Sequence, residues 1–146
     1  MEIKELGHVV LYVSDLNRSL AFYRDTLGFP QIVGGPGIAL FSGGRTHHEM
    51  LLIEVGGAPS AKRGPEPGLY HIGFKIGDGP EAAQKAYQEL VAAGVRVIGT
   101  TDHGVTHSIY VEDPDGNELE LYADVSDEWK RNPAAIMSPT RHLDLG

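Results

Sequence analysis

Residues 7–13 read Gly-His-Val-Val-Leu-Tyr-Val, and residues 70–76 read Tyr-His-Ile-Gly-Phe-Lys-Ile. Each stretch is a short, mostly apolar run with a histidine at its second place. Glycine, proline or charged residues bound each run, as is typical of a β-strand. Because His8 and His71 stand at matching places in two similar strands, we predict that the chain contains an internal repeat.

A helical pattern follows each of these strands. Residues 15–27 and residues 81–93 carry apolar side chains at helical spacing, and Gly28 and Gly94 follow them where a left-handed residue is favoured. Three extended segments come after each helix, at about residues 30–33, 38–42, 48–55, 95–99, 107–112 and 118–122. Both copies therefore read strand, helix, strand, strand, strand. We predict an α+β fold of two βαβββ modules, at about residues 5–55 and 69–123.

Composition narrows the class of protein. With 146 residues, 41% of them hydrophobic, the chain fits one globular domain with a substantial core. A net charge of −8 without a basic cluster argues against nucleic acid as a partner. Cysteine is absent from the sequence, which excludes disulfides and thiolate chemistry. We find neither a membrane-spanning run nor a signal-peptide core, so we expect a cytoplasmic protein without a membrane partner.

The alternation of side chains along a strand predicts which residues share a face of the sheet. If Val9, Leu11 and Val13 pack on the helix, His8 lies on the opposite face, and the same reasoning places His71 and Glu120 there. In residues 48–55 we expect the odd-numbered apolar side chains to pack inward. The residues thereby predicted for the open face include His8, His48, Met50, Leu52, Glu54, His71, Tyr110 and Glu120.

Two imidazoles and one carboxylate on one face form a recognised metal set. His8, His71 and Glu120 would occupy one side of a divalent ion such as iron and leave its other positions open. A single histidine in a strand is a weak signal by itself. The equivalence of His8 and His71 in the repeat, together with Glu120, makes a metal site the preferred interpretation.

The sequence resembles the vicinal oxygen chelate superfamily over nearly all of residues 5–123. The resemblance rests mainly on Gly7-His8-Val9, Asp15-Leu16, Phe22-Tyr23 and the run of residues 113–121. It implies a cupped mixed sheet with helices on the outer face, in a domain of residues 1–123 followed by a C-terminal tail of residues 124–146. The superfamily hosts several reactions, so membership alone does not choose one.

Within that superfamily the chain is most similar to extradiol dioxygenases of the catechol 2,3-dioxygenase type. This resemblance implies Fe(II), with Mn(II), Ni(II) or Zn(II) as alternatives, bound by His8, His71 and Glu120. It also implies that His48 lies beside the dioxygen site, and that His103 and Tyr110 contact the substrate. The implied reaction opens the ring of a small catechol-type aromatic with dioxygen. A homodimer is expected, and most such enzymes carry a second, non-catalytic pair of modules, which this chain lacks.

Two other interpretations remain open from the sequence. A glyoxalase-I-like isomerase or lyase would use four ligands, with Glu54 as the equivalent of Glu120 in the first module. A metal-free drug-binding protein of the bleomycin-resistance kind would hold an acidic or aromatic ligand in the cup. The second alternative conflicts with the retained histidines and Glu120, because unpaired polar groups in a pocket lower stability unless something coordinates them.

Overall fold

The computed structural model describes residues 1–59 and 65–146. The chain divides into two compact units, Met1–Ala61 with Pro114–Gly116, and Lys62–Asp113 with Asn117–Gly146. Each unit combines helices with one mixed sheet, so the predicted α+β class is confirmed. Within the described ranges, every helix is too short or too polar to cross a membrane.

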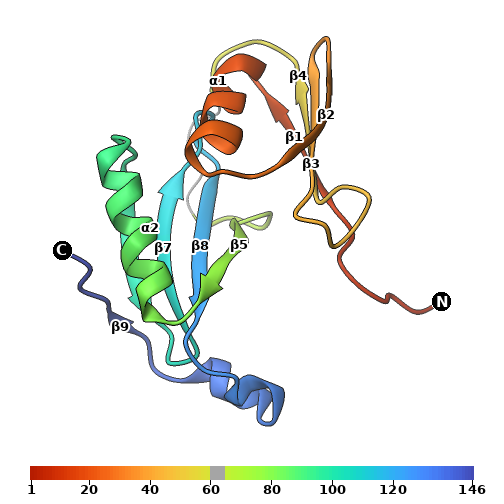
Figure 1. Ribbon diagram of the computed structural model, residues 1–146. Helices are drawn as coiled ribbons and strands as arrows, with labels where there is room; N and C mark the ends of the chain where they lie inside the picture. The colour runs from red at the N-terminus through yellow and green to blue at the C-terminus, as the bar shows by residue number, and fades with distance from the viewer. Residues whose placement is uncertain (60–64) are drawn as a thin grey trace. The chain divides into compact units, whose positions relative to one another are not determined.

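Unit 1 follows the predicted order of strand, helix and three strands (Figure 1). Its sheet has the order β1-β4-β3-β2, in which β1 runs parallel to β4 and the other neighbours are antiparallel. Its elements are β1 Val9–Val13, α1 Leu16–Leu20, the π-helix η1 Ala21–Thr26, β2 Gln31–Gly35, β3 Ile38–Phe41 and β4 Met50–Glu54. The first half of the repeat is thus present as predicted.

The helical segment of unit 1 has clear chemical boundaries. The side chain of Asp15 accepts a hydrogen bond from the Arg18 amide at 2.9 Å, which satisfies one of the free donors at the helix start. The second half is wound more loosely than an α-helix, with the Leu27 amide bonded to the Phe22 carbonyl. Gly28 then adopts a φ of 70°, which confirms the predicted left-handed end.

Unit 2 repeats the order and adds the C-terminal residues to it (Figure 1). Its sheet has the order β5-β8-β7-β6-β9, and β5 runs parallel to β8. Its elements are β5 His71–Asp78, α2 Pro80–Ala92, β6 Val97–Asp102, β7 Thr106–Glu112, β8 Glu118–Asp124, the 3-10 helices η2 Glu128–Lys130 and η3 Pro133–Met137, and β9 Arg141–His142. The tail therefore supplies an edge strand to this sheet, which its sequence pattern did not predict.

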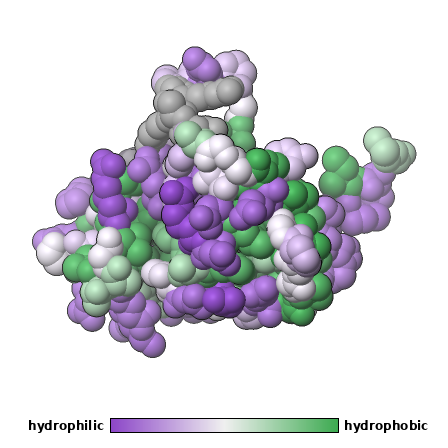
Figure 2. Space-filling view, turned by 90° about the horizontal axis from the view of Figure 1, so that it is seen from above, coloured by the Kyte–Doolittle hydropathy of each residue, from purple (hydrophilic) through white to green (hydrophobic). Residues whose placement is uncertain are grey.

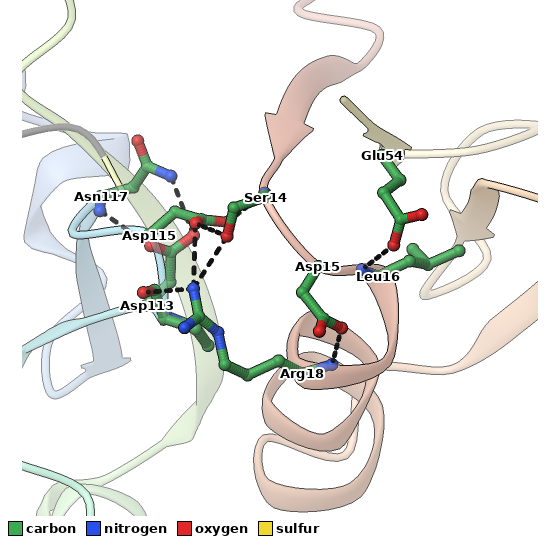
Figure 3. A network of polar contacts seen from close by, with 9 residues as sticks. Ser14, Asp15, Leu16, Arg18, Glu54, Asp113, Asp115 and Asn117 are labelled. Carbon is green, nitrogen blue, oxygen red and sulfur yellow. Dashed lines mark hydrogen bonds and ion pairs between the residues drawn. The ribbon is translucent and has the colours of Figure 1, made fainter. Parts of the chain in front are cut away.

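The turn before β8 is a structural part of unit 1 (Figure 3). The carboxylate of Asp115, which is 8% exposed, accepts hydrogen bonds from the Ser14 amide at 3.1 Å and from the Ser14 hydroxyl. Arg18 donates to the same carboxylate at 3.2 Å and to the Pro114 carbonyl at 3.1 Å. A buried carboxylate with charged and backbone donors is well satisfied. The turn thus holds the residues at the start of α1 in place through hydrogen bonds. The sequence analysis predicted no chemical role for this turn.

The face assignment of β4 was wrong in the sequence analysis. Met50 and Leu52 are 1% and 0% exposed and belong to the core, whereas they were predicted for the open face. In the parallel pairing Leu51 aligns with Val10, which is 44% exposed, so Leu51 lies on the open side. Residues 50–53 are all hydrophobic, so alternation could not decide between the two faces. The register with β1 decides it.

Neighbouring leucines in β4 test this register. We expect Leu52→Ala to lower the free energy of unfolding by about 2–5 kcal/mol, because it opens a cavity in the core. The matched change Leu51→Ala should cost less than about half as much, because that side chain is only partly removed from water. Urea unfolding followed by circular dichroism measures both values. Equal losses would contradict the register.

Candidate metal centre

The alignment of β5 with β8 brings an imidazole and a carboxylate together in unit 2. Gly73 aligns with Glu120, so the side chains of His71 and Glu120 lie on the same face of the sheet. The distance from His71 Nε2 to Glu120 Oε2 is 3.2 Å, and the two side chains are 25% and 17% exposed. Two of the three predicted metal ligands therefore lie in direct contact within one unit.

The strand β7 fixes the other oxygen of this carboxylate. Ser108 Oγ donates a hydrogen bond to Glu120 Oε1 at 2.6 Å, and the Tyr110 hydroxyl donates to the same oxygen at 3.2 Å. Ser108 is fully buried. The sequence analysis missed Ser108, although it lies two residues before Tyr110 and alternation places both on one face. With Oε1 satisfied, Oε2 is left to face the imidazole.

His103 joins this group from the hairpin between β6 and β7. The turn is closed by the hydrogen bond from the His103 amide to the Thr106 carbonyl, and Gly104 takes a φ of 81° in it. His103 Nε2 then lies 3.0 Å from the Tyr110 hydroxyl. Burial raises the pKa of Tyr110 above its usual value, and the charge of Glu120 raises it further. The phenol therefore stays protonated and acts as a donor.

The pair His71 and Glu120 fits a divalent cation. Two ligands at adjacent positions of a metal, with bonds of ~2.1 Å, lie roughly 3 Å apart. The observed separation of 3.2 Å is close to that value. On the far side of the ring, His71 Nδ1 is buried, makes no hydrogen bond to any residue described, and lies 3.8 Å from Glu118 Oε1. A carboxylate behind a histidine ligand is a common means of orienting the ring.

In unit 1 the structure brings His8 and His48 together. Their ring centroids are 4.3 Å apart, and His48 lies in the loop before β4 rather than in the strand. Burial lowers the pKa of His48, and the nearby imidazoles of His8 and His47 lower it further. The His48 ring is therefore neutral near pH 7. Of the predicted site residues, unit 1 groups these two and unit 2 groups the other four.

The glyoxalase-like alternative takes Glu54 as the equivalent of Glu120, and the register of the strands contradicts that equivalence. Glu120 aligns with the second residue after His71, whereas the second residue after His8 is Val10, which aligns with Leu51. Leucine thus occupies the equivalent position. Glu54 Oε2 instead accepts a hydrogen bond from the Leu16 amide at 2.7 Å, at the start of α1 (Figure 3). Glu54 acts as a helix cap.

A groove lies farther along the same face of unit 2. It has a volume of about 310 Å³ and is lined by residues of β5, β8 and the tail, among them Lys75, Asp124 and Trp129. Lys75 Nζ lies 2.7 Å from Asp78 and 2.8 Å from Asp124, and these hydrogen bonds raise its pKa. The lysine charge is therefore already balanced within the protein. The tail contributes Trp129, which is 41% exposed, to the groove wall.

Comparison with known proteins places this geometry in a family. A model described as the Glyoxalase/Bleomycin resistance protein/Dioxygenase superfamily matches residues 5–121. The catechol-2,3-dioxygenase of Bacillus subtilis is 35% identical over 90% of this chain. The chain spans 46% of the length of that relative, so it corresponds to about half of the longer protein.

Shorter relatives match over most of their length. The metallothiol transferase FosB of Staphylococcus epidermidis is 32% identical, over 84% of this chain and 83% of its own. A mutant of the fosfomycin resistance protein FosX from Listeria monocytogenes, solved with Mn(II) and 1S,2S-dihydroxypropylphosphonic acid, superposes with a TM-score of 0.68. It is 25% identical, over 89% of this chain and 98% of its own. The fold is thus shared by proteins of different chemistry.

Replacing Glu54 tests its assignment as a cap. We expect Glu54→Ala to lower the free energy of unfolding by about 1 kcal/mol, because the Leu16 amide loses its acceptor. The metal content after reconstitution should equal that of the unaltered protein, because no ligand is removed. Elemental analysis and denaturant unfolding measure the two quantities. A loss of bound metal in this variant would restore Glu54 as a ligand.

Proposed function

We propose that this chain, which belongs to the Glyoxalase/Bleomycin resistance protein/Dioxygenase superfamily, is an Fe(II)-dependent extradiol dioxygenase that opens a catechol-type ring with dioxygen. The observation that carries the proposal is the cluster of unit 2, in which Tyr110 contacts both Glu120 and His103. This cluster combines the proposed metal-binding pair, His71 and Glu120, with the neutral hydrogen-bond donor Tyr110 and with His103, whose imidazole can transfer a proton. The similarity to a catechol-2,3-dioxygenase supports the same reaction class.

In this proposal the metal is held by His8, His71 and Glu120, one carboxylate and two imidazoles. When bound, Fe(II) supplies open coordination positions for the two catechol oxygens and for dioxygen. Ser108 holds Glu120 in place through its hydrogen bond of 2.6 Å, and thereby keeps Oε2 directed toward His71. The alternatives Mn(II), Ni(II) and Zn(II) suit the same donor types, and a Mn(II)-bound relative shares the fold.

The remaining residues of the cluster handle protons and charge. Tyr110 keeps its proton and can donate it in a hydrogen bond to a substrate oxygen, because its pKa is raised. His103 Nε2 lies 3.0 Å from that hydroxyl oxygen and donates a hydrogen bond to it, so His103 could serve as the acid or help to hold the ring of the substrate. His48, neutral and beside His8, would stabilise negative charge that develops on bound oxygen.

Fosfomycin modification is the rival with a specific observation behind it, because FosB matches this chain over 83% of its own length. A phosphonate is doubly negative and calls for unpaired cations. Near the groove of unit 2, Lys75 is already paired with Asp78 and Asp124. Because Lys75 is not available to a phosphonate, its pairing supports a catechol as the substrate. The glyoxalase-like alternative loses its fourth ligand at Leu51.

We also propose that the protein works as a homodimer. Several large apolar side chains of unit 1 are exposed on β1, β2 and β3, among them Val10, Tyr12 and Val33. Figure 2 shows hydrophobic surface beside hydrophilic surface on the face it views. Exposed apolar surface of this kind favours association with another copy. We expect light scattering at micromolar concentration to give twice the mass of one chain, 15.8 kDa. A monomer would contradict this assembly.

Metal content and oxygen uptake test the catalytic proposal together. We expect about one Fe(II) per chain, yellow ring-opened products from catechols, and loss of bound iron in Glu120→Ala. Tyr110→Phe should retain iron and lower kcat on the order of 100-fold, because it removes the donor while keeping the ring. His142→Ala replaces an exposed histidine of strand β9 that is not among the proposed site residues; it serves as the control and should be unaffected. Activity on fosfomycin with silence toward catechols would support the rival.

A further inference from the structure

Three histidines of unit 1 come together beside the start of β1. His8, His47 and His48 each offer a ring nitrogen, and these nitrogens all lie within 4.8 Å of one another. The ring centroids of His47 and His48 are 4.5 Å apart, and those of His8 and His47 are 5.9 Å apart. We propose that these three imidazoles form a separate binding site for a borderline divalent cation such as Zn²⁺, Ni²⁺ or Cu²⁺.

The loop that carries two of the ligands is held in place by Glu49. Its carboxylate accepts hydrogen bonds from the amides of Arg45 and Thr46, each at 2.9 Å, and from the amide of Gly43. Ser42 Oγ donates to the Thr46 carbonyl at 2.9 Å. Three amides and one carbonyl of this short loop are therefore bonded to the side chains of Ser42 and Glu49 at its ends. A loop built in this way presents its histidines in a fixed position.

The same loop is tied to the residue before His8. The guanidinium of Arg45 donates to the Gly7 carbonyl at 3.2 Å, and Thr46 Oγ1 lies 3.4 Å from the same oxygen. Thr46 Oγ1 also donates to the His48 carbonyl at 2.6 Å. These contacts hold the backbone of the loop against the start of β1. Backbone contacts between the loop and the residue before His8 therefore bring the three imidazole rings together.

The donor chemistry indicates which cation fits. His47 Nδ1 and His48 Nδ1 are 2.6 Å apart, so one of these nitrogens donates a hydrogen bond and the other accepts it with a lone pair that a cation could take in place of the proton. Two ligands on opposite sides of a cation with bonds of ~2.1 Å lie roughly 4.2 Å apart, so small ring rotations bring three nitrogens within bonding reach. A set of imidazoles suits zinc, copper and nickel. The pair of His71 and Glu120 differs, because it includes a carboxylate.

The proposed site goes beyond the ring-cleavage function and needs only unit 1. His8 is a proposed ligand in both sites, so a cation held by His47 and His48 would compete for it. We therefore expect excess Zn²⁺ to weaken Fe(II) binding by the unaltered chain. The competition should be weaker in His47→Ala, because Zn²⁺ can then compete only directly for the proposed iron ligands, which this variant leaves in place. Direct metal binding reports this without reference to catalysis.

The decisive experiment removes the proposed iron pair first. In the double variant His71→Ala/Glu120→Ala, stripped of metal by a chelator, titration calorimetry with Ni²⁺ should still show about one site per chain. Adding His47→Ala should weaken that binding at least on the order of 10–100-fold, as loss of support at a metal site commonly does. Electron paramagnetic resonance of bound Cu²⁺ should show fewer coordinating nitrogens in the triple variant.

Adding His142→Ala in place of His47→Ala provides the matched control, because His142 is an exposed histidine of β9. This control should bind Ni²⁺ as the double variant does. The proposal is overturned if the double variant does not bind Ni²⁺, or if His47→Ala and His142→Ala have equal effects. His47→Asn, judged folded by circular dichroism, repeats the test with a polar side chain. Absence of catechol cleavage would leave these results unaffected.

Discussion

The register of the two parallel strand pairs is the constraint on which the candidate site depends. In unit 2, pairing of β5 with β8 places His71 and Glu120 on one face and in contact at 3.2 Å. In unit 1, the corresponding pairing places leucine at the equivalent of Glu120. A shift by one residue would turn either carboxylate or imidazole to the helix side. The repeat thus places both a histidine and a carboxylate, His71 and Glu120, in unit 2. In unit 1 it places only the histidine, His8.

The carboxylate of Glu120 connects this backbone constraint to chemistry. One of its oxygens receives Ser108 and Tyr110, which leaves the other directed at His71. Burial raises the pKa of Tyr110, and the charge and hydrogen bond of Glu120 raise it further, so the phenol stays protonated. One local hydrogen-bond network therefore both fixes the proposed ligand Glu120 and keeps Tyr110 as a hydrogen-bond donor. Such coupling is expected where polar groups are half-buried and mutually satisfied.

The sequence predicted the repeat, the helix ends and the faces of β1, β5 and β8, because one alternating set in each of those strands is clearly apolar. It failed at β4, where residues 50–53 are hydrophobic on both faces and only pairing with β1 decides. Because the faces of β4 were assigned the wrong way round, Glu54 was considered as a metal ligand rather than as a helix cap. Ser108 and His47 were missed since a serine or an adjacent histidine carries little signal until its neighbours are known. Strand β9 was not predicted, because it forms only by pairing with β6, about forty residues earlier in the sequence.

The turn at residues 114–116 limits where the chain could be cut without loss of contacts in unit 1. Asp115 comes late in the chain, yet its carboxylate is the acceptor for the Ser14 amide in unit 1. A fragment that ended before residue 114 would lack the carboxylate that accepts hydrogen bonds from the Ser14 amide and the Arg18 guanidinium. The start of α1 therefore depends on a turn that the second half of the sequence supplies.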